Sequence, residues 1–231
     1  MNENNQITRL KNHPIINALS TIGHIKGIVC YGSYAMGTFD EYSDIDIYAF
    51  CKPSIVLSSI REETLENVIG VYGLDINHAE FGWDNQWNPE GDRLFLNKVQ
   101  FDITYNTVDW IRTVIRNVKE KGATSIPELE FRPYTMLGLL DNSVTVYDPE
   151  LIVRDLKSSL YPYPIKLKDV LVSQSLSIAR DSLAELENYT QRNIGNTAFH
   201  FHLQRVMDSL STMLFAVNER YDPASKRVEE V

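Results

Sequence analysis

Two short segments rich in apolar residues, Ile25–Tyr31 and Asp44–Phe50, lie close together in the chain and are separated by a polar segment. Each has the length and composition of a buried strand rather than of a helix. Gly32 directly follows the first segment, and Gly37 lies five residues later. Because glycine permits tight turns, we expect two strands joined by a compact turn.

The turn carries groups that can bind a phosphate. Gly32 and Ser33 at a strand end expose backbone N–H groups and one hydroxyl. If a helix begins there, its positive end also points into the turn, which forms a phosphate cradle. Gly37 lets the chain return toward the second strand.

Two carboxylates begin the second strand. Asp44 and Asp46 are two residues apart, so both side chains leave the same face, while Ile45 and Ile47 point into the core. The carboxylates can converge on Mg²⁺, which uses few protein carboxylates and completes its shell with water and substrate phosphates. A phosphate cradle beside such a pair is what nucleotidyl transfer requires.

A third carboxylate is expected on a neighbouring strand. Residues 99–105 alternate, with apolar side chains on one face and Gln100, Asp102 and Thr104 on the other. An acid in such a strand is costly unless it is paired or bound to a metal. Asp102 is therefore expected either to complete the metal site or to act as the general base on an incoming hydroxyl.

The motif Gly-Ser, short helix, Gly, Ser-Asp-x-Asp resembles that of the nucleotidyltransferase superfamily, which includes DNA polymerase beta and the aminoglycoside and lincosamide nucleotidyltransferases. The matching residues are Gly32, Ser33, Gly37, Ser43, Asp44 and Asp46. The resemblance implies that Gly32, Ser33, Gly37 and Ser43 bind the nucleotide, and that Asp44, Asp46 and Asp102 are catalytic and bind Mg²⁺, with ATP or another NTP as co-substrate.

One position departs from the family pattern. Bacterial members often carry Arg or Lys just before the second Gly, and this chain has Met36 there. By analogy with relatives that use a basic residue of the helical domain, Arg192, Arg205 or Lys226 is a candidate for the missing triphosphate contact.

The expected fold is α+β: a nucleotidyltransferase-type mixed sheet with flanking helices, followed by a helical-bundle C-terminal domain. A catalytic domain over residues 1–125 and a helical substrate-binding domain over 126–231 are predicted. Strands are expected at 25–31, 44–50, 75–83, 93–105 with a hairpin turn at Asn97-Lys98, and 144–147, with residues 83–92 as a loop. Helices are expected at 5–21 (kinked at Pro14), 54–68, 107–121, 131–140, 149–159, 166–190 and 195–220.

Composition limits the partners. The chain has 22 Lys and Arg against 31 Asp and Glu, a net charge of −9, which disfavours nucleic acid and favours a small, cationic acceptor. There is no apolar stretch long enough for a membrane span and no signal-peptide pattern at the N-terminus. Cys30 and Cys51 lie in apolar segments and read as reduced core residues. A cytoplasmic protein is expected; the sequence does not indicate an oligomeric state.

Other polar residues fit ordinary structural positions better. His78 and Glu80 are expected on a solvated strand face, and His200 and His202 do not face one site. Tyr34 and Tyr42 flank the turn and suit packing as well as base stacking. Glu185, Glu187 and Asp208 are expected on a solvated helix face.

The sequence therefore predicts a Mg²⁺-dependent enzyme that transfers AMP, or another NMP, from an NTP to a hydroxyl of a small molecule, first among them an aminoglycoside-type antibiotic. Two alternatives remain open: an adenylyltransferase that modifies a protein, as the antitoxin-type relatives do, and a catalytically weak nucleotide-binding regulatory protein.

Overall fold

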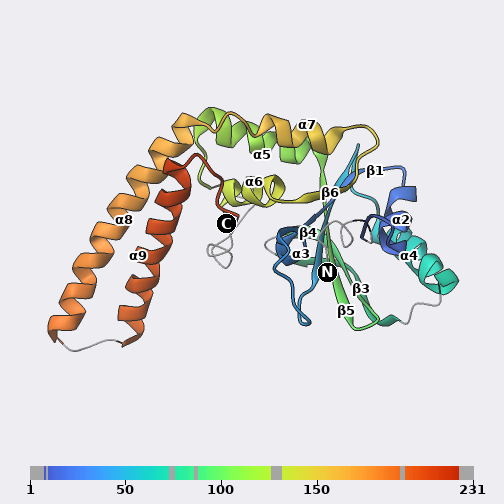
Figure 1. The fold of residues 1–231 in the computed structure, drawn as a ribbon, viewed down its shortest axis with the longest axis horizontal. Helices are drawn as coiled ribbons and strands as arrows, with labels where there is room; N and C mark the ends of the chain where they lie inside the picture. The colour runs from blue at the N-terminus through green and yellow to red at the C-terminus, as the bar shows by residue number, and fades with distance from the viewer. Residues whose placement is uncertain are drawn as a thin grey trace.

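The computed structural model of the 231-residue chain describes residues 8, 10–72, 76–85, 88–125, 132–192 and 196–223. Its elements, in chain order, are α2 (Pro14–Thr21), β1 (Ile25–Tyr31), α3 (Gly32–Met36), β2 (Ile45–Cys51), α4 (Ser58–Tyr72), β3 (Ile76–Asn85), β4 (Asn88–Leu96), β5 (Val99–Thr107), α5 (Val108–Lys121), α6 (Pro133–Asp141), β6 (Val144–Tyr147), α7 (Ile152–Ser159), α8 (Ile165–Arg192) and α9 (Asn196–Val217). The predicted α+β class is confirmed (Figure 1).

The strands form one mixed sheet in the order β3-β4-β5-β2-β1-β6. Of the described strand pairs, β2 with β5 is parallel and the other four are antiparallel. The α3 turn joins β1 to its neighbour β2, whereas β5 arrives beside β2 only after α4 and the β3–β4 hairpin. The parallel register places Asp46 directly opposite Asp102.

The two faces of the sheet pack against different helices. Ile47 on one face belongs to a core that includes Leu65 and the helices α2 and α4. Tyr48 and Phe50 belong to a second core formed with α5, α6 and α7. Neighbouring residues of β2 therefore enter opposite cores, as the alternation of a strand requires.

A buried ion pair fixes α4 to the β3–β4 hairpin. The side chains of Arg61 and Asp92 are both 0% exposed, and Nε and Nη2 of Arg61 donate to the two carboxylate oxygens at 2.8 and 2.9 Å. Nη2 also donates to Glu90 at 3.0 Å, and Nη1 donates to the carbonyl of Val56. The guanidinium lies 4.4 Å from the centre of the Tyr105 ring. The buried positive charge of Arg61 is therefore balanced by the buried negative charge of Asp92.

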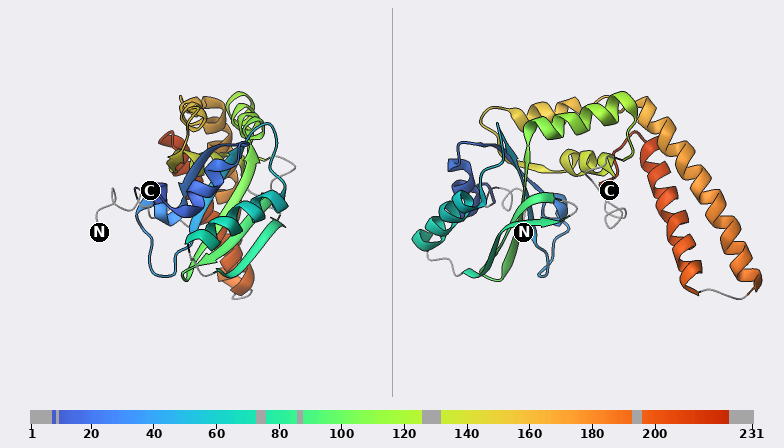
Figure 2. Two further views of the ribbon diagram at one scale, coloured as in Figure 1. Left: turned by 90° about the vertical axis from the view of Figure 1, so that its right-hand side faces the viewer. Right: turned by 180° about the vertical axis from the view of Figure 1, so that it is seen from behind.

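Helices α8 and α9 form a long antiparallel hairpin that projects away from the sheet, while α5, α6 and α7 lie between the two (Figures 1 and 2). Tyr221, just after α9, is buried at the base of the hairpin. Its hydroxyl donates to the carbonyl of Leu160 at 2.8 Å, and its ring packs 4.8 Å from that of Tyr163. Lys168 pairs with Glu219 at 3.1 Å. These contacts hold the base of the hairpin against the segment after α7.

Two predictions about local structure are wrong. The expected helix 5–21 is interrupted: His13 is extended and caps α2, and Pro14 begins this helix instead of kinking a longer one, because its fixed φ suits a first helical position. The expected loop 83–92 is largely strand, because β3 extends to Asn85 and β4 begins at Asn88. The pairing of these strands shifts register near Trp83, so the alternation that marks a strand is interrupted there.

The remaining elements follow the predictions, with shifted ends. The Asn97-Lys98 turn joins β4 to β5, both residues with positive φ. The sheet takes its sixth strand, β6, from beyond residue 125, and the boundary placed at that residue stays a prediction. None of the described helices combines the length and apolar character that a membrane crossing requires.

Replacing Arg61 by Met should lower the free energy of unfolding by about 3–5 kcal/mol, because Asp92 is left charged and unpaired in the core. Urea denaturation measures this change. Arg112→Met is the control: its partner Asp109 is exposed and 3.8 Å away, so a change of no more than about 0.5 kcal/mol is expected. Equal effects of the two substitutions would contradict the role given to the buried pair.

Candidate active site

A row of polar side chains crosses the sheet on the face that carries the second core. The strand registers pair Glu80 with Arg93, Arg93 with Asp102, Asp102 with Asp46, and Asp46 with Tyr31. Residues directly opposite each other on paired strands point to the same face. Four strand pairings therefore bring these five side chains into one line.

Three carboxylates converge on this face of the sheet, and two of them, Asp46 and Asp102, belong to the row. Asp44 directly precedes β2 and lies two residues before Asp46. Ligand atoms of Asp44, Asp46 and Asp102 all lie within 4.8 Å of one another, and each residue is partly exposed. In the part of the chain that the structure describes, this is the one such group of potential metal ligands that is found. The structure thus brings together the three acids that the sequence analysis selected, while their function stays a proposal.

Arg93, which the sequence analysis missed, holds one of the three acids. Its Nε and Nη2 donate to the two oxygens of Asp102 at 2.8 and 3.1 Å, and Gln100 donates to Asp102 at 3.0 Å. The hydrogen bonds to Asp102 raise the pKa of Arg93, whereas its partial burial lowers it. The negative charges of Glu80 and Asp44 raise this pKa further. The arginine is therefore a fixed positive charge beside the acids. Arg93 begins a segment that was expected to be a strand, but only the pairing of β4 with β5 shows that its side chain faces Asp102.

The α3 turn lies at the end of β1, as predicted. Gly32 and Gly37 have φ values of 70° and 73°, which favour glycine. The N–H groups of Gly37 and Thr38 both donate to the carbonyl of Ser33, which closes the turn. No side chain caps the N-terminus of α3 at Tyr31. Its first N–H groups are therefore not satisfied by a capping side chain, as a phosphate cradle requires.

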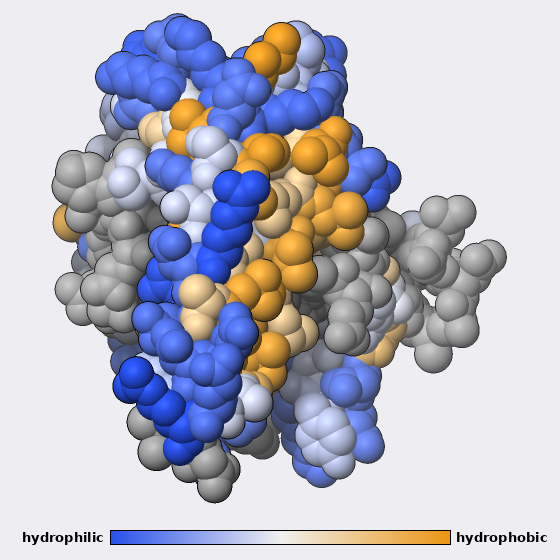
Figure 3. All heavy atoms as spheres, turned by 90° about the vertical axis from the view of Figure 1, so that its left-hand side faces the viewer, coloured by the Kyte–Doolittle hydropathy of each residue, from blue (hydrophilic) through white to orange (hydrophobic). Residues whose placement is uncertain are grey.

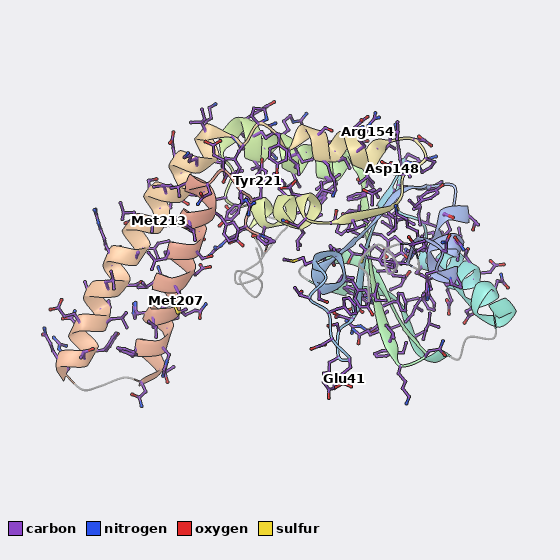
Figure 4. All side chains as sticks on the ribbon, in the orientation of Figure 1. Glu41, Asp148, Arg154, Met207, Met213 and Tyr221 are labelled. Atoms are coloured by element: carbon purple, nitrogen blue, oxygen red, sulfur yellow. The ribbon has the colours of Figure 1, made fainter. Side chains whose placement is uncertain are left out.

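Ser43 shapes the loop that leads to the first carboxylate. Its hydroxyl donates to Asp40 Oδ1 at 2.8 Å and accepts from the Asp40 N–H at 2.9 Å, and Tyr42 N–H also donates to Asp40. The hydrogen bonds from Ser43 and Tyr42 lower the pKa of Asp40. Ser43 thus positions Asp44 along the chain; its predicted contact with the nucleotide stays a prediction. Glu41 lies at the exposed end of this loop (Figure 4).

Two other ionisable groups near the acids remain protonated. Burial raises the pKa of Tyr31 well above its usual value, and the nearby charge of Asp46 raises it further. Burial likewise raises the pKa of the Cys30 thiol to about 12, with a smaller contribution from Asp46. Cys30 and Cys51 are both free and buried, as predicted. Neither the Tyr31 hydroxyl nor the Cys30 thiol therefore adds a negative charge beside the turn at neutral pH.

Asp208 is partly exposed on α9, and it has a partner that the sequence analysis did not predict. Its carboxylate forms an ion pair with Arg132, which in turn donates to Thr212 at 3.1 Å. Arg132, Arg205 and Asp208 contribute to the lining of a cavity of about 350 Å³ between the start of α6 and the hairpin. Arg192 is exposed and Lys226 lies outside the described residues, so the choice among the basic candidates stays open.

The other candidates occupy ordinary positions. Glu80, Glu185, Glu187 and His200 are exposed, and His202 packs 5.7 Å from the ring of Tyr189. Tyr34 stacks on Phe39 at 4.4 Å, whereas Tyr42 is exposed. The side chain of His78 lies outside the described ones.

The residues present fit a magnesium ion. Carboxylate oxygens are the hard ligands that Mg²⁺ prefers, and partial exposure leaves room for water and phosphate ligands. Three carboxylates beside one guanidinium leave a formal charge of −2, which one divalent cation would balance. The three acids would hold the ion between them, with Arg93 on the outer side of Asp102.

Residues 14–74 match the family model described as Nucleotidyltransferase domain. Residues 14–74 of the chain thus carry the signature of a nucleotidyltransferase domain. The matched segment contains the α3 turn, Asp44 and Asp46, whereas Arg93 and Asp102 lie beyond it and are placed at the site by the sheet. No curated protein matches the chain.

Three solved structures of nucleotide-related proteins resemble the fold at low similarity. A nucleotidyltransferase-like protein from Exiguobacterium sibiricum is 11% identical with a TM-score of 0.39, over 93% of this chain and 58% of its own. A toxin–antitoxin solved with AMP-PNP is 14% identical with a TM-score of 0.35, over 79% and 99%. Terminal uridylyl transferase 4 from Trypanosoma brucei with bound UPU is 12% identical with a TM-score of 0.29, over 70% and 66%. The chain thus spans 58% of the length of the first.

Asp46→Asn should weaken binding of Mn²⁺, used as a probe for Mg²⁺, by about tenfold or more, because one of three anionic ligands is lost. Isothermal titration calorimetry measures the affinity. Glu41→Gln removes an equal charge from the adjacent loop and should change the affinity less than twofold. Similar losses in the two variants would show that only the general negative charge attracts the ion.

Arg93→Gln should make the stability of the protein depend more on divalent metal, because the three acids lose their built-in counter-charge. Without metal, the melting temperature should fall. With saturating Mg²⁺, the variant should gain more degrees than the unaltered protein does, as followed by thermal unfolding with and without EDTA. An equal gain in the two proteins would contradict the counter-charge role.

Proposed function

We propose that the protein transfers a nucleoside monophosphate, AMP from ATP in the first instance, to a hydroxyl of a small molecule. The observation that carries the proposal is the convergence of Asp44, Asp46 and Asp102 beside the uncapped α3 turn. Phosphoryl transfer relies on positioning and charge neutralisation rather than on covalent chemistry of the protein. A rigid acid cluster next to N–H donors meets both needs.

Each part of the site has a distinct role in this proposal. Gly32 and Ser33 bind the triphosphate through the N–H groups of α3, and Asp44 and Asp46 hold Mg²⁺. When bound, the ion would neutralise charge on the phosphates and make the attacking hydroxyl easier to deprotonate. The acceptor oxygen then forms a bond to the α-phosphorus and the bond to the β-phosphate breaks, so that pyrophosphate leaves and the hydroxyl proton passes to solvent.

The hydrogen bonds of Asp102 favour one of its two expected roles. Both of its oxygens already accept bonds, from Arg93 and from Gln100. Hydrogen bonds to both oxygens hold the carboxylate in a fixed orientation, as is usual for carboxylates that bind a metal ion. We therefore assign Asp102 to the metal site rather than to general-base catalysis.

The acceptor that we propose is a polyhydroxylated cation of the aminoglycoside type. Its support is the net charge of −9, which attracts cations to the molecule. The cavity beside α6 adds hydroxyl groups of Ser175, Ser209 and Thr212. Among the described residues, its one lining carboxylate, Asp208, is already paired with Arg132, so the described lining suits the hydroxyl groups of such a molecule better than its ammonium groups.

A transfer assay tests the proposal. The protein is incubated with Mg²⁺, each α-labelled NTP in turn, and a panel of aminoglycosides and lincosamides. We expect label to pass from ATP to one of these compounds, and Asp46→Asn to lower the rate about 100-fold or more. Glu41→Gln should keep the full rate. Transfer that survives Asp46→Asn would contradict the assignment of the acids.

Other outcomes separate the alternatives. Label that appears only on a protein, when cell extract replaces the compounds, would support protein adenylylation instead. Nucleotide binding without any transfer would support the regulatory alternative. Failure to bind any NTP in the presence of Mg²⁺ would contradict all three.

A further inference from the structure

Helix α9 carries an exposed apolar stripe that does not pack against α8. Its members recur at alternating spacings of four and three residues and are 38–61% exposed: Leu203, Met207, Leu210, Leu214 and Val217. Met207 is labelled in Figure 4. The residues that face α8 are different ones, among them Val206 and Ala216. The spacing is that of a coiled-coil seam.

Helix α8 carries a matching stripe. Ile165 and Val172 are seven residues apart, as are Leu176 and Leu183, and four residues separate the two pairs. Val172 is half-buried, and the other three are 39–71% exposed. With 3.6 residues per turn, both stripes fall on the same face of the antiparallel hairpin, opposite the face that lines the cavity with Asp208. Figure 3 shows apolar side chains gathered in a band on this end of the molecule.

The face of the hairpin that carries the two stripes is nearly as large as one side of a typical interface. A 22-residue helix is about 33 Å long, and two adjacent helices are about 20 Å wide. Taken as a flat rectangle, the face therefore measures roughly 650 Å². A stable complex buries about 800 Å² per partner. The nine apolar side chains of the two stripes gather on this one face, and such exposed apolar patches mark interaction sites.

Two charged residues on the α8 stripe indicate what covers the face. Asp169 and Arg180 lie on the same side of the helix as Leu176, eleven residues or about 16 Å apart. Both are exposed, and neither has an ion-pair partner among the residues that the structure describes. When two copies of α8 meet antiparallel across a two-fold axis, Asp169 of each copy faces Arg180 of the other. The two-fold axis therefore produces two Asp169–Arg180 pairs of opposite charge.

We propose that the α8–α9 hairpin pairs with the hairpin of a second copy of this chain to form a four-helix bundle. The stripes of the two copies form its core, because like-spaced apolar seams interlock. The α9 stripe contains no charged residue, so the negative charges of two acidic chains do not meet in this core. The cavity side of each hairpin, with Asp208, remains outside the bundle.

Light scattering after size-exclusion chromatography of the full chain tests the proposal. We expect twice the chain mass of 26.5 kDa at micromolar concentrations. Leu210→Lys should raise the dimer Kd at least about 100-fold, because it buries a charge in the seam. Leu57→Glu is the control, since Leu57 is 70% exposed but precedes α4, and it should leave the dimer intact. Circular dichroism shows whether each variant is folded.

A charge-reversal series identifies the partner as a second copy. Arg180→Asp should raise the dimer Kd about tenfold or more, because it places two acids opposite each other. The double variant Asp169→Arg with Arg180→Asp restores both pairs and should return the Kd to within threefold of the original. A monomer at 100 µM or above, or a dimer that neither Leu210→Lys nor Arg180→Asp weakens, would overturn the proposal. Association only with a different protein would overturn it as well.

Discussion

The parallel pairing of β2 with β5 is the constraint on which the site depends. It joins strands separated by α4 and the β3–β4 hairpin, and its register sets Asp46 opposite Asp102. Because side chains alternate along a strand, a shift of one residue would move Asp102 to the face of α2 and α4 and bury a charge there. The apolar residues on that face, such as Ile103, therefore fix the register and thereby the acid cluster.

Three acids within 4.8 Å repel one another, and the sheet supplies part of the compensation. Arg93 reaches Asp102 because β4 lies beside β5, and β4 is in turn held from the opposite face by Asp92 bonded to Arg61. Neighbouring residues of β4 thus serve the two faces: Asp92 anchors the strand in the core and Arg93 neutralises the site. Without the Arg61–Asp92 pair, β4 would be held less firmly, and so would Arg93 beside the three acids.

The local parts of the site could be predicted from the sequence, because they depend on neighbours in the chain. The glycines of the α3 turn, the shared face of Asp44 and Asp46, and the alternation around Asp102 all follow from short-range geometry. Arg93 could not be found in this way, because its role depends on the pairing of three strands. The irregular pairing near Trp83 also removed the alternation that would have marked β3 and β4 as long strands.

The helical half shows the same division between local and distant information. Helical periodicity located α8 and α9, but it could not separate a face that packs within the hairpin from one that is left uncovered. Val206 and Leu210 are both apolar, yet one is buried against α8 and the other is 54% exposed. Asp208 lies between them in sequence and is held by Arg132 from the start of α6. Each turn of α9 therefore meets three environments, namely the partner helix, the cavity and the exposed stripe, and only the tertiary arrangement assigns them.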